Sequence, residues 1–184
     1  NTSTIEIKKF AYPEYQLGVI PNTHLPSVIN LNEAVSHHMA LIGVTGSGKS
    51  FLAREIIKKL QKDTKVICVD FTGEYIKELV SLKPVHLIDS SKLPELEKHI
   101  ADKETEANKG KYTDKAKLLE YKNNIQSKLN GYIDTFIKSK DNNIALFELP
   151  ELSNTAFILE FTQIFLEGVF NYAKKMKDKK FVLY

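Results

Sequence analysis

The chain has 184 residues, 42% of them hydrophobic, and a formal net charge of +3. This length and apolar content suffice for one ordinary folded domain, which excludes an intrinsically disordered protein. The sequence shows no apolar run near the roughly 18 residues of a membrane span and no signal-peptide core, so we expect a cytoplasmic protein. The small net charge neither requires nor excludes nucleic acid as a partner.

Residues 1–32 are predicted to form a β-rich lead-in. β-prone segments occur at residues 4–10, 15–20 and 27–32, and they are interrupted by Pro13, Pro21 and Pro26. β-branched and aromatic residues bounded by proline are typical of short strands and turns. From residue 33 onward the pattern changes, and we place the second domain at residues 33–184.

In residues 33–184 apolar runs alternate with helical patterns. Runs that fit buried strands lie at residues 38–42, 65–70, 85–89, 143–149 and 180–184. Strands separated by helices indicate βαβ units, and therefore an α/β fold with a mostly parallel central sheet. The single cysteine, Cys68, lies inside the second run, so we expect an inert, buried thiol.

A glycine-rich phosphate-binding motif, GVTGSGKS, occupies residues 43–50. It follows the first apolar run and precedes apolar residues at helical spacing, which is the strand, loop and helix context that the motif requires. Backbone N–H groups of such a loop cradle phosphates at a helix N-terminus, with Lys49 on the β- and γ-phosphates and Ser50 on Mg²⁺. The predicted ATP-binding residues are Thr45, Gly46, Ser47, Gly48, Lys49, Ser50 and Phe51.

A second motif, VDFTGEY, ends the apolar run at residues 65–70. Asp70 would stand at the carboxyl end of a strand, the edge where open α/β sheets bind ligands, and Glu74 follows shortly after. The two carboxylates could hold Mg²⁺ through water or orient the attacking water. They could equally cap the helix that follows, and the spacing alone leaves both readings open.

Two long helices are predicted in the second half of the chain. One carries apolar residues every three or four positions, namely Leu118, Tyr121, Ile125, Leu129, Tyr132 and Phe136. The other, at residues 156–177, is apolar on most faces, so we expect it to be largely buried. Between the third and fourth strands, the charged residues 95–117 predict an exposed helix and a mobile loop near Gly110.

The sequence resembles the HerA/FtsK group of P-loop ATPases, and most closely the HerA-type DNA translocases. The segments that carry the resemblance are LNEAVSHHMALIGVTGSGKSFLAREII, VICVDFTGEY and NIALFELPELSNTAFILEF with the residues that follow it. The resemblance implies a RecA-like ATPase that uses ATP and Mg²⁺ and translocates or unwinds duplex DNA as a homo-hexamer. It also implies a nuclease or other effector as partner, in DNA end processing or antiphage defence.

By motif match the resemblance assigns catalytic roles to Lys49, Asp70 and Glu74, with Ser50 on Mg²⁺ and Asp70 on the metal either directly or through water. The chain departs from the family at His37 and His38, where members often carry Arg-His, and Arg54 is its only arginine. The second set of acids that the family places after the last strand is not present. We therefore expect the ATPase core to be incomplete at its C-terminal end and residues 1–32 to be the remnant of a small β-barrel.

Two other functions remain open. ATPases of type IV secretion share the glycine loop and a G-E-Y-like segment. The protein could therefore be a secretion-type ATPase that moves a different cargo. A nucleotide-binding scaffold without turnover is also compatible with the missing acids and with a chain that holds 1 arginine among 26 basic residues.

Overall fold

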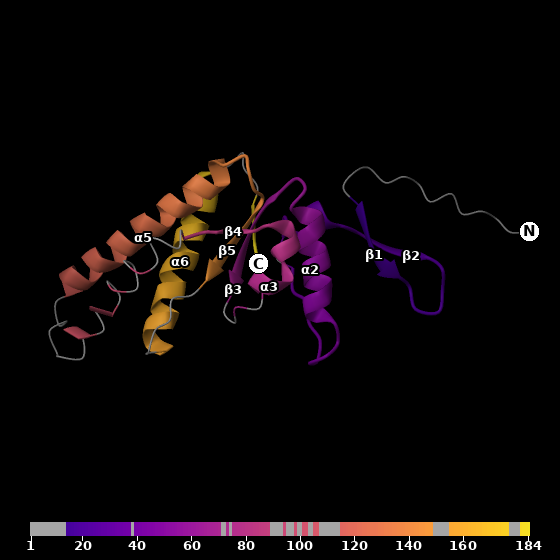
Figure 1. Cartoon of the computed structure of the whole chain (residues 1–184), viewed down its shortest axis with the longest axis horizontal. Coiled ribbons are helices and arrows are strands. Elements are labelled where there is room, and N and C mark those ends of the chain that lie inside the picture. Colours follow the sequence, from indigo (N-terminus) through magenta and orange to yellow (C-terminus); the bar gives the residue numbers. More distant parts are fainter. Residues whose placement is uncertain are drawn as a thin grey trace, which may run out of the picture. The chain divides into compact units, whose positions relative to one another are not determined.

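The computed structural model describes residues 14–37, 39–70, 73, 75–88, 94, 98, 101–102, 105–106, 115–148, 155–176 and 181–184. The chain divides into two compact units, Asn1–Lys62 and Asp63–Tyr184 (Figure 1). The predicted division into residues 1–32 and 33–184 stays a prediction. None of the described helices is both long and apolar enough to cross a membrane.

The first unit begins with an antiparallel β-hairpin. Strands β1 (Glu14–Val19) and β2 (Pro26–Asn30) pair with each other, and a bulge lies between Gln16 and Gly18. The predicted β-rich lead-in is thus confirmed for these two strands, whereas the segment at residues 4–10 lies outside the described residues. That this hairpin is the remnant of a barrel stays a prediction.

Two helices complete the first unit. Helix α1 (Leu31–Ala34) begins at Asn30, whose side chain accepts a hydrogen bond from the N–H of Glu33. Helix α2 (Lys49–Leu60) has the predicted apolar spacing, and its buried residues are Ala53, Ile56, Ile57 and Leu60. Lys58 and Lys59 lie in its last turn, where positive charge favours the helix dipole.

The strand predicted before the glycine loop is wrong for its described residues. Residues 39–44 have no regular secondary structure, and Ile42 is 94% exposed. A strand needs the hydrogen bonds of a neighbouring strand, and the described strands of both sheets give residues 39–44 none. The run thus has the apolar residues that are typical of a strand, but no described strand pairs with it.

The second unit is built on a four-stranded sheet with the order β4-β5-β3-β6. Its strands are β3 (Lys65–Asp70), β4 (Val85–His86), β5 (Ile144–Glu148) and β6 (Phe181–Leu183). All three pairings are parallel, which confirms an α/β fold with a parallel sheet. Such a sheet is compatible with a P-loop NTPase, while the RecA-like details stay a prediction.

Two short helical segments follow β3, namely α3 (Tyr75–Glu78) and the 3₁₀ helix η1 (Val80–Leu82). The long helices α5 (Lys115–Lys138) and α6 (Thr155–Lys175) match the two that the sequence predicted. They lie side by side (Figure 1), and together with one face of the sheet they form the main hydrophobic core. The predicted helix and loop at residues 95–117 fall mainly outside the described residues.

The core depends on the alternation of side chains along the strands. Ile67, Ala145 and Phe147 point to the face that α5 and α6 cover, and the ring of Phe147 stacks on that of Phe165 at 3.7 Å between centroids. The expectation that α6 is largely buried is wrong. Its outer side leaves apolar residues exposed, namely Leu159, Leu166 and Phe170.

Candidate functional site

The glycine loop ends in the conformation that its motif predicts. Gly46 and Gly48 have φ values of 80° and 85°, which side chains with a Cβ rarely adopt. Gly48 is the N-cap of α2 and has no side chain to bond the first N–H groups of the helix, while its carbonyl accepts the hydrogen bond from Leu52 N. This helix start therefore has the backbone geometry that suits an anion.

Lys49 folds back over the loop. Its Nζ donates a hydrogen bond of 2.7 Å to the carbonyl O of Val44, so the ammonium group already binds an oxygen acceptor inside the loop. A Cβ on Gly43 would lie 2.5 Å from Ser47 Oγ, so a larger residue would force the Ser47 hydroxyl to move. A phosphate oxygen is the same kind of acceptor as the Val44 carbonyl, and the residues of the loop thus fit a phosphate group.

The remaining residues of the loop are open to solvent. Thr45, Ser47 and Ser50 are exposed, so the Ser50 hydroxyl is accessible to a nucleotide-bound Mg²⁺. Phe51 is 61% exposed, and the guanidinium of Arg54 lies 5.9 Å from the centroid of its ring. The roles assigned to these residues stay predictions.

His37, which stands where the family often has arginine, is held within its own turn. Its Nδ1 lies 3.1 Å from Ser36 Oγ and 3.3 Å from the carbonyl O of Glu33. These contacts stabilise the end of α1, which agrees with a structural role for this histidine. His38 lies outside the described residues.

Asp70 lies at the carboxyl end of β3 and is 3% exposed. Its Oδ1 accepts a hydrogen bond of 2.8 Å from Gly73 N, and its Oδ2 accepts one of 3.0 Å from Tyr75 N. Both carboxylate oxygens therefore bind the backbone that leads into α3. Of the two roles that the sequence left open, capping is the one that these contacts perform, and Glu74 lies outside the described residues.

The sequence reasoning missed a second acid at this edge of the sheet. Glu148 ends β5 and is the register partner of Asp70, so the two side chains stand on the same face of adjacent parallel strands. His86 of β4 bonds it, with 2.5 Å between Nδ1 and Oε2. The contact spans 62 residues of sequence, and only the strand order reveals it.

Tyr184, which directly follows β6, completes a polar row at this edge of the sheet. Its hydroxyl lies 3.0 Å from that of Tyr75, and the two rings meet edge to face with centroids 5.5 Å apart. Tyr184 is also joined to β3 by two backbone hydrogen bonds, from its N–H to Ile67 and from Val69 to its carbonyl. His86, Glu148, Asp70 and Tyr184 thus lie across the carboxyl ends of the four strands in sheet order.

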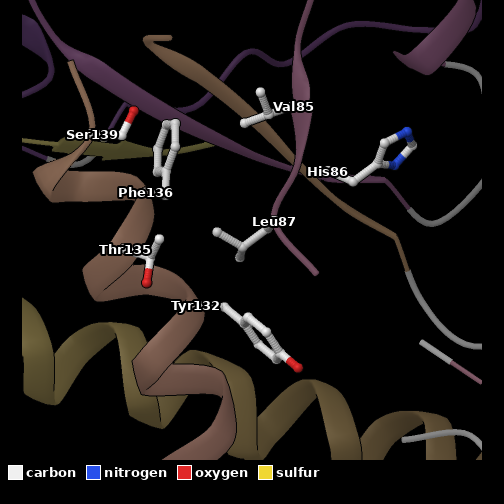
Figure 2. A pocket seen from close by; sticks show the side chains of 7 residues that line it. All are labelled: Val85, His86, Leu87, Tyr132, Thr135, Phe136 and Ser139. Atoms are coloured by element: carbon white, nitrogen blue, oxygen red, sulfur yellow. The ribbon is translucent and has the colours of Figure 1, made fainter. Parts of the chain in front are cut away.

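A separate hollow of about 480 Å³ lies between β4 and α5 (Figure 2). Val85 and Leu87 point toward α5, whereas the ring of His86 turns to the opposite side of the strand, as β alternation requires. The other lining side chains come from α5 and its end, namely Tyr132, Thr135, Phe136 and Ser139. Apart from His86, which also belongs to the polar row, the lining consists of apolar and hydroxyl side chains.

Lys49 belongs to the first unit and Asp70 to the second. Within the described part of the chain, no group of three or more histidine, cysteine, aspartate or glutamate side chains could hold a metal ion. The metal roles of Ser50 and, through water, of Asp70 stay predictions.

Comparison with known proteins supports the prediction that the chain binds a nucleotide. Residues 15–102 match the family model described as the central domain of the helicase HerA. An uncharacterized protein of Aquifex aeolicus (strain VF5), aq_aa31, is 38% identical over 69 residues, which are 36% of this chain and 26% of that protein. No solved structure matches. The family match includes both the glycine loop and Asp70, so the predicted resemblance to HerA/FtsK-type P-loop ATPases is confirmed.

Proposed function

We propose that this protein is an ATP-hydrolysing motor that translocates or unwinds duplex DNA, because residues 15–102 match the family model of the HerA central domain. The observation that carries the proposal is the glycine loop at the start of α2, with Lys49 folded onto it within the matched residues. A P-loop ATPase is what the family match supports directly. Duplex DNA as the cargo is our extension of it.

In this proposal the loop binds the phosphates of ATP. The N–H groups at the start of α2 and the Lys49 ammonium group neutralise the phosphate charge, and Lys49 exchanges the Val44 carbonyl for a phosphate oxygen. The Ser50 hydroxyl would hold Mg²⁺, which would neutralise part of the phosphate charge. Hydrolysis of ATP supplies the free energy for movement. The residues of the loop hold the reacting phosphate bond in the orientation that hydrolysis needs.

A motor of this class would work as a homo-hexamer around DNA and would serve a nuclease or other effector, as in antiphage defence. DNA held in a ring is contacted through its phosphates, so binding should be insensitive to base sequence and should weaken steeply with salt. The chain's 25 lysines against 1 arginine suit phosphate contacts by point charges better than base readout by arginine forks.

The test is the rate of ATP hydrolysis by the full-length protein with and without duplex DNA. The wild type should be stimulated by DNA, and Lys49→Ala should lose both the basal and the stimulated rate. Lys58→Ala is the matched control, since Lys58 lies on the same helix and pairs with Glu55 at the surface. A rate that duplex DNA leaves unchanged would contradict the DNA motor and favour a secretion-type ATPase. ATP binding without turnover would favour the scaffold.

A further inference from the structure

Phe51 is a large apolar side chain on the polar side of α2. The buried residues of this helix lie on the opposite side, whereas Phe51 shares its side with Glu55 and Lys58, which form an ion pair at the surface. Phe51 is 61% exposed. The packing of α2 on the described part of the first unit therefore does not account for a phenylalanine at this position.

The same residue borders the glycine loop. Phe51 is the third residue of α2, directly after Lys49 and Ser50. Helical side chains lean toward the N-terminus, so a side chain in the first turn covers the start of the helix and not the turns that follow. Gly48 precedes Phe51 by three residues, the spacing at which helical side chains meet, and has no side chain to cover the ring. The ring is thus open next to the helix start.

Arg54 contacts the ring of Phe51. Its guanidinium lies over that ring, 5.9 Å from the centroid. A cation over one face of an aromatic ring is attracted by the π electrons, and this contact limits how the ring can turn. Because Phe51 remains 61% exposed despite the contact, the ring still offers surface on which a planar group can stack.

The order of the phosphates in ATP gives this ring a ligand. In loops of this class the lysine reaches the β- and γ-phosphates and the serine hydroxyl binds Mg²⁺, while backbone N–H groups cradle the α- and β-phosphates. The base is joined through ribose to the α-phosphate, at the end of ATP that Lys49 and Ser50 do not hold. Phe51 is the next residue, and it is the only Phe, Tyr or Trp between residues 31 and 70.

We propose that the base of the bound nucleotide stacks on the ring of Phe51, while the guanidinium of Arg54 holds that ring in place. This inference rests on the proposed ATPase function and adds to it a contact with the base. A ring contacts the face of a base and not the hydrogen-bonding groups on its edge. The contact therefore favours purines for their larger area and accepts adenine and guanine alike.

The first arm of the test measures binding to the full-length protein by isothermal titration in the presence of Mg²⁺. The probes are non-hydrolysable analogues of ATP and GTP, and inorganic tripolyphosphate, which has the phosphates without a base. The wild type should bind both analogues more tightly than tripolyphosphate. Phe51→Ala should weaken both analogues by about five- to a hundredfold, the range for loss of one base stacked on an aromatic side chain, and should leave tripolyphosphate within about twofold.

Three results of this titration would overturn the proposal. Unchanged affinity of Phe51→Ala for both analogues would show that the base does not contact the ring. An equal loss for tripolyphosphate would show that Phe51 acts on the phosphates and not on the base. A loss confined to one of the two analogues would show that the edge of the base is recognised and not its face.

Phe170→Ala is the matched control. Phe170 is 60% exposed on α6, and the Nζ of Lys174 lies 4.3 Å from the centroid of its ring, so it is also an exposed phenylalanine beside a cation. It does not belong to the helix that follows the glycine loop. This variant should bind all three probes like the wild type. A loss equal to that of Phe51→Ala would count against the proposal, because the effect would not be specific to Phe51.

The second arm replaces the ring instead of removing it. Residues 1–184 contain no tryptophan, so Phe51→Trp adds a fluorophore whose signal is read against the wild type. Stacking of the base on the indole should quench this fluorescence as the ATP analogue is added, whereas tripolyphosphate should leave it unchanged. Phe170→Trp should respond to neither probe. Fluorescence of Phe51→Trp that stays constant at saturating analogue, or that tripolyphosphate quenches equally, would contradict stacking.

Failure of this inference differs from failure of the proposed function. A wild type that binds neither the analogues nor tripolyphosphate would contradict the function and the stacking contact together. If the wild type binds and hydrolyses ATP while Phe51→Ala binds the analogues equally well, the function stands and the stacking contact is wrong.

Discussion

Lys49 and Val44 are joined by a hydrogen bond of 2.7 Å between the Lys49 Nζ and the Val44 carbonyl O, across the glycine loop. The ammonium group thus lies over the space that the loop encloses, where a phosphate would take the place of the carbonyl. Because the lysine is already directed inward, ATP need not reorganise the side chain before binding. Lys49 is therefore expected to contribute to affinity as well as to turnover.

Lys49→Ala should weaken ATP binding by about ten- to a hundredfold, the value of one hydrogen bond to a charged group. Isothermal titration with a non-hydrolysable ATP analogue and Mg²⁺ measures this directly. Lys58→Ala should bind like the wild type, because its exposed ion pair with Glu55 lies outside the loop. Equal affinity of the wild type and Lys49→Ala would show that the loop does not hold the nucleotide as described.

Gly48→Ala should destabilise the protein by about 1–2 kcal/mol, because the new Cβ is forced into the left-handed conformation. The surrounding space is open at Gly48, so strain is the cause and not a clash. Gly18→Ala is the comparison, since Gly18 also has open space but no positive φ. Urea unfolding of both variants tests this, and an equal loss in the two would refute the strain argument.

Replacing one glycine with alanine on each of the two long helices should change the stability of the protein in opposite directions. Gly131 of α5 meets nothing within 4 Å, so Gly131→Ala should stabilise the protein by about 0.5–1 kcal/mol. A Cβ on Gly168 of α6 would lie 2.8 Å from Asn130 Oδ1, a buried acceptor that has no hydrogen-bond partner among the described residues, so Gly168→Ala should destabilise. Thermal unfolding compares the two.

Asn130→Ala tests the cause of that second effect. Removing the side chain that Gly168 faces should make Gly168→Ala less harmful in the double variant than in the wild-type background. Additive effects of the two variants would show that the contact between Asn130 and Gly168 does not cause the loss of stability in Gly168→Ala.

Cys68 should react slowly with iodoacetamide in the folded protein. Burial raises the pKa of its thiol to about 12, with a smaller effect from the charge of Asp70, so little thiolate exists at pH 8. The reaction rate should keep rising with pH beyond 9, where an exposed thiol levels off. Because the folded state holds this proton more tightly, its contribution to stability is present below pH 9 and is lost as the pH rises toward about 12.

Since Cys68 is the only cysteine, mass spectrometry of the labelled protein gives the rate without ambiguity. In 6 M guanidinium, a standard unfolding concentration, the same thiol should react at the rate of a free peptide thiol. Equal rates with and without guanidinium at pH 8 would contradict a buried thiol on β3.

Local sequence patterns predicted the elements that can be identified from their own residue spacing or composition. The spacing of Tyr121, Ile125 and Leu129 predicted α5, and the apolar runs predicted the positions of β3, β5 and β6. The glycine loop was identified by its motif because each glycine meets a fixed backbone requirement. Placement of Asp70 at the carboxyl end of β3 followed from strand polarity.

Features that depend on pairing could not be predicted in this way. The run at residues 39–42 has the composition of a strand but lacks a neighbour, and Glu148 meets His86 only because β4 and β5 are adjacent. Side-chain exposure on α6 also depends on what covers the helix, so an all-round apolar sequence did not reveal that Phe170 lies exposed. In each case the missing information is the identity of the spatial neighbour.

Translocation itself is the central claim, and displacement of a triplex-forming strand from duplex DNA measures it most directly. With ATP and Mg²⁺ the full-length protein should strip the third strand from a duplex that carries it far from the loading end. The Lys49→Ala variant should not. Hydrolysis of ATP without displacement of the third strand would contradict the account.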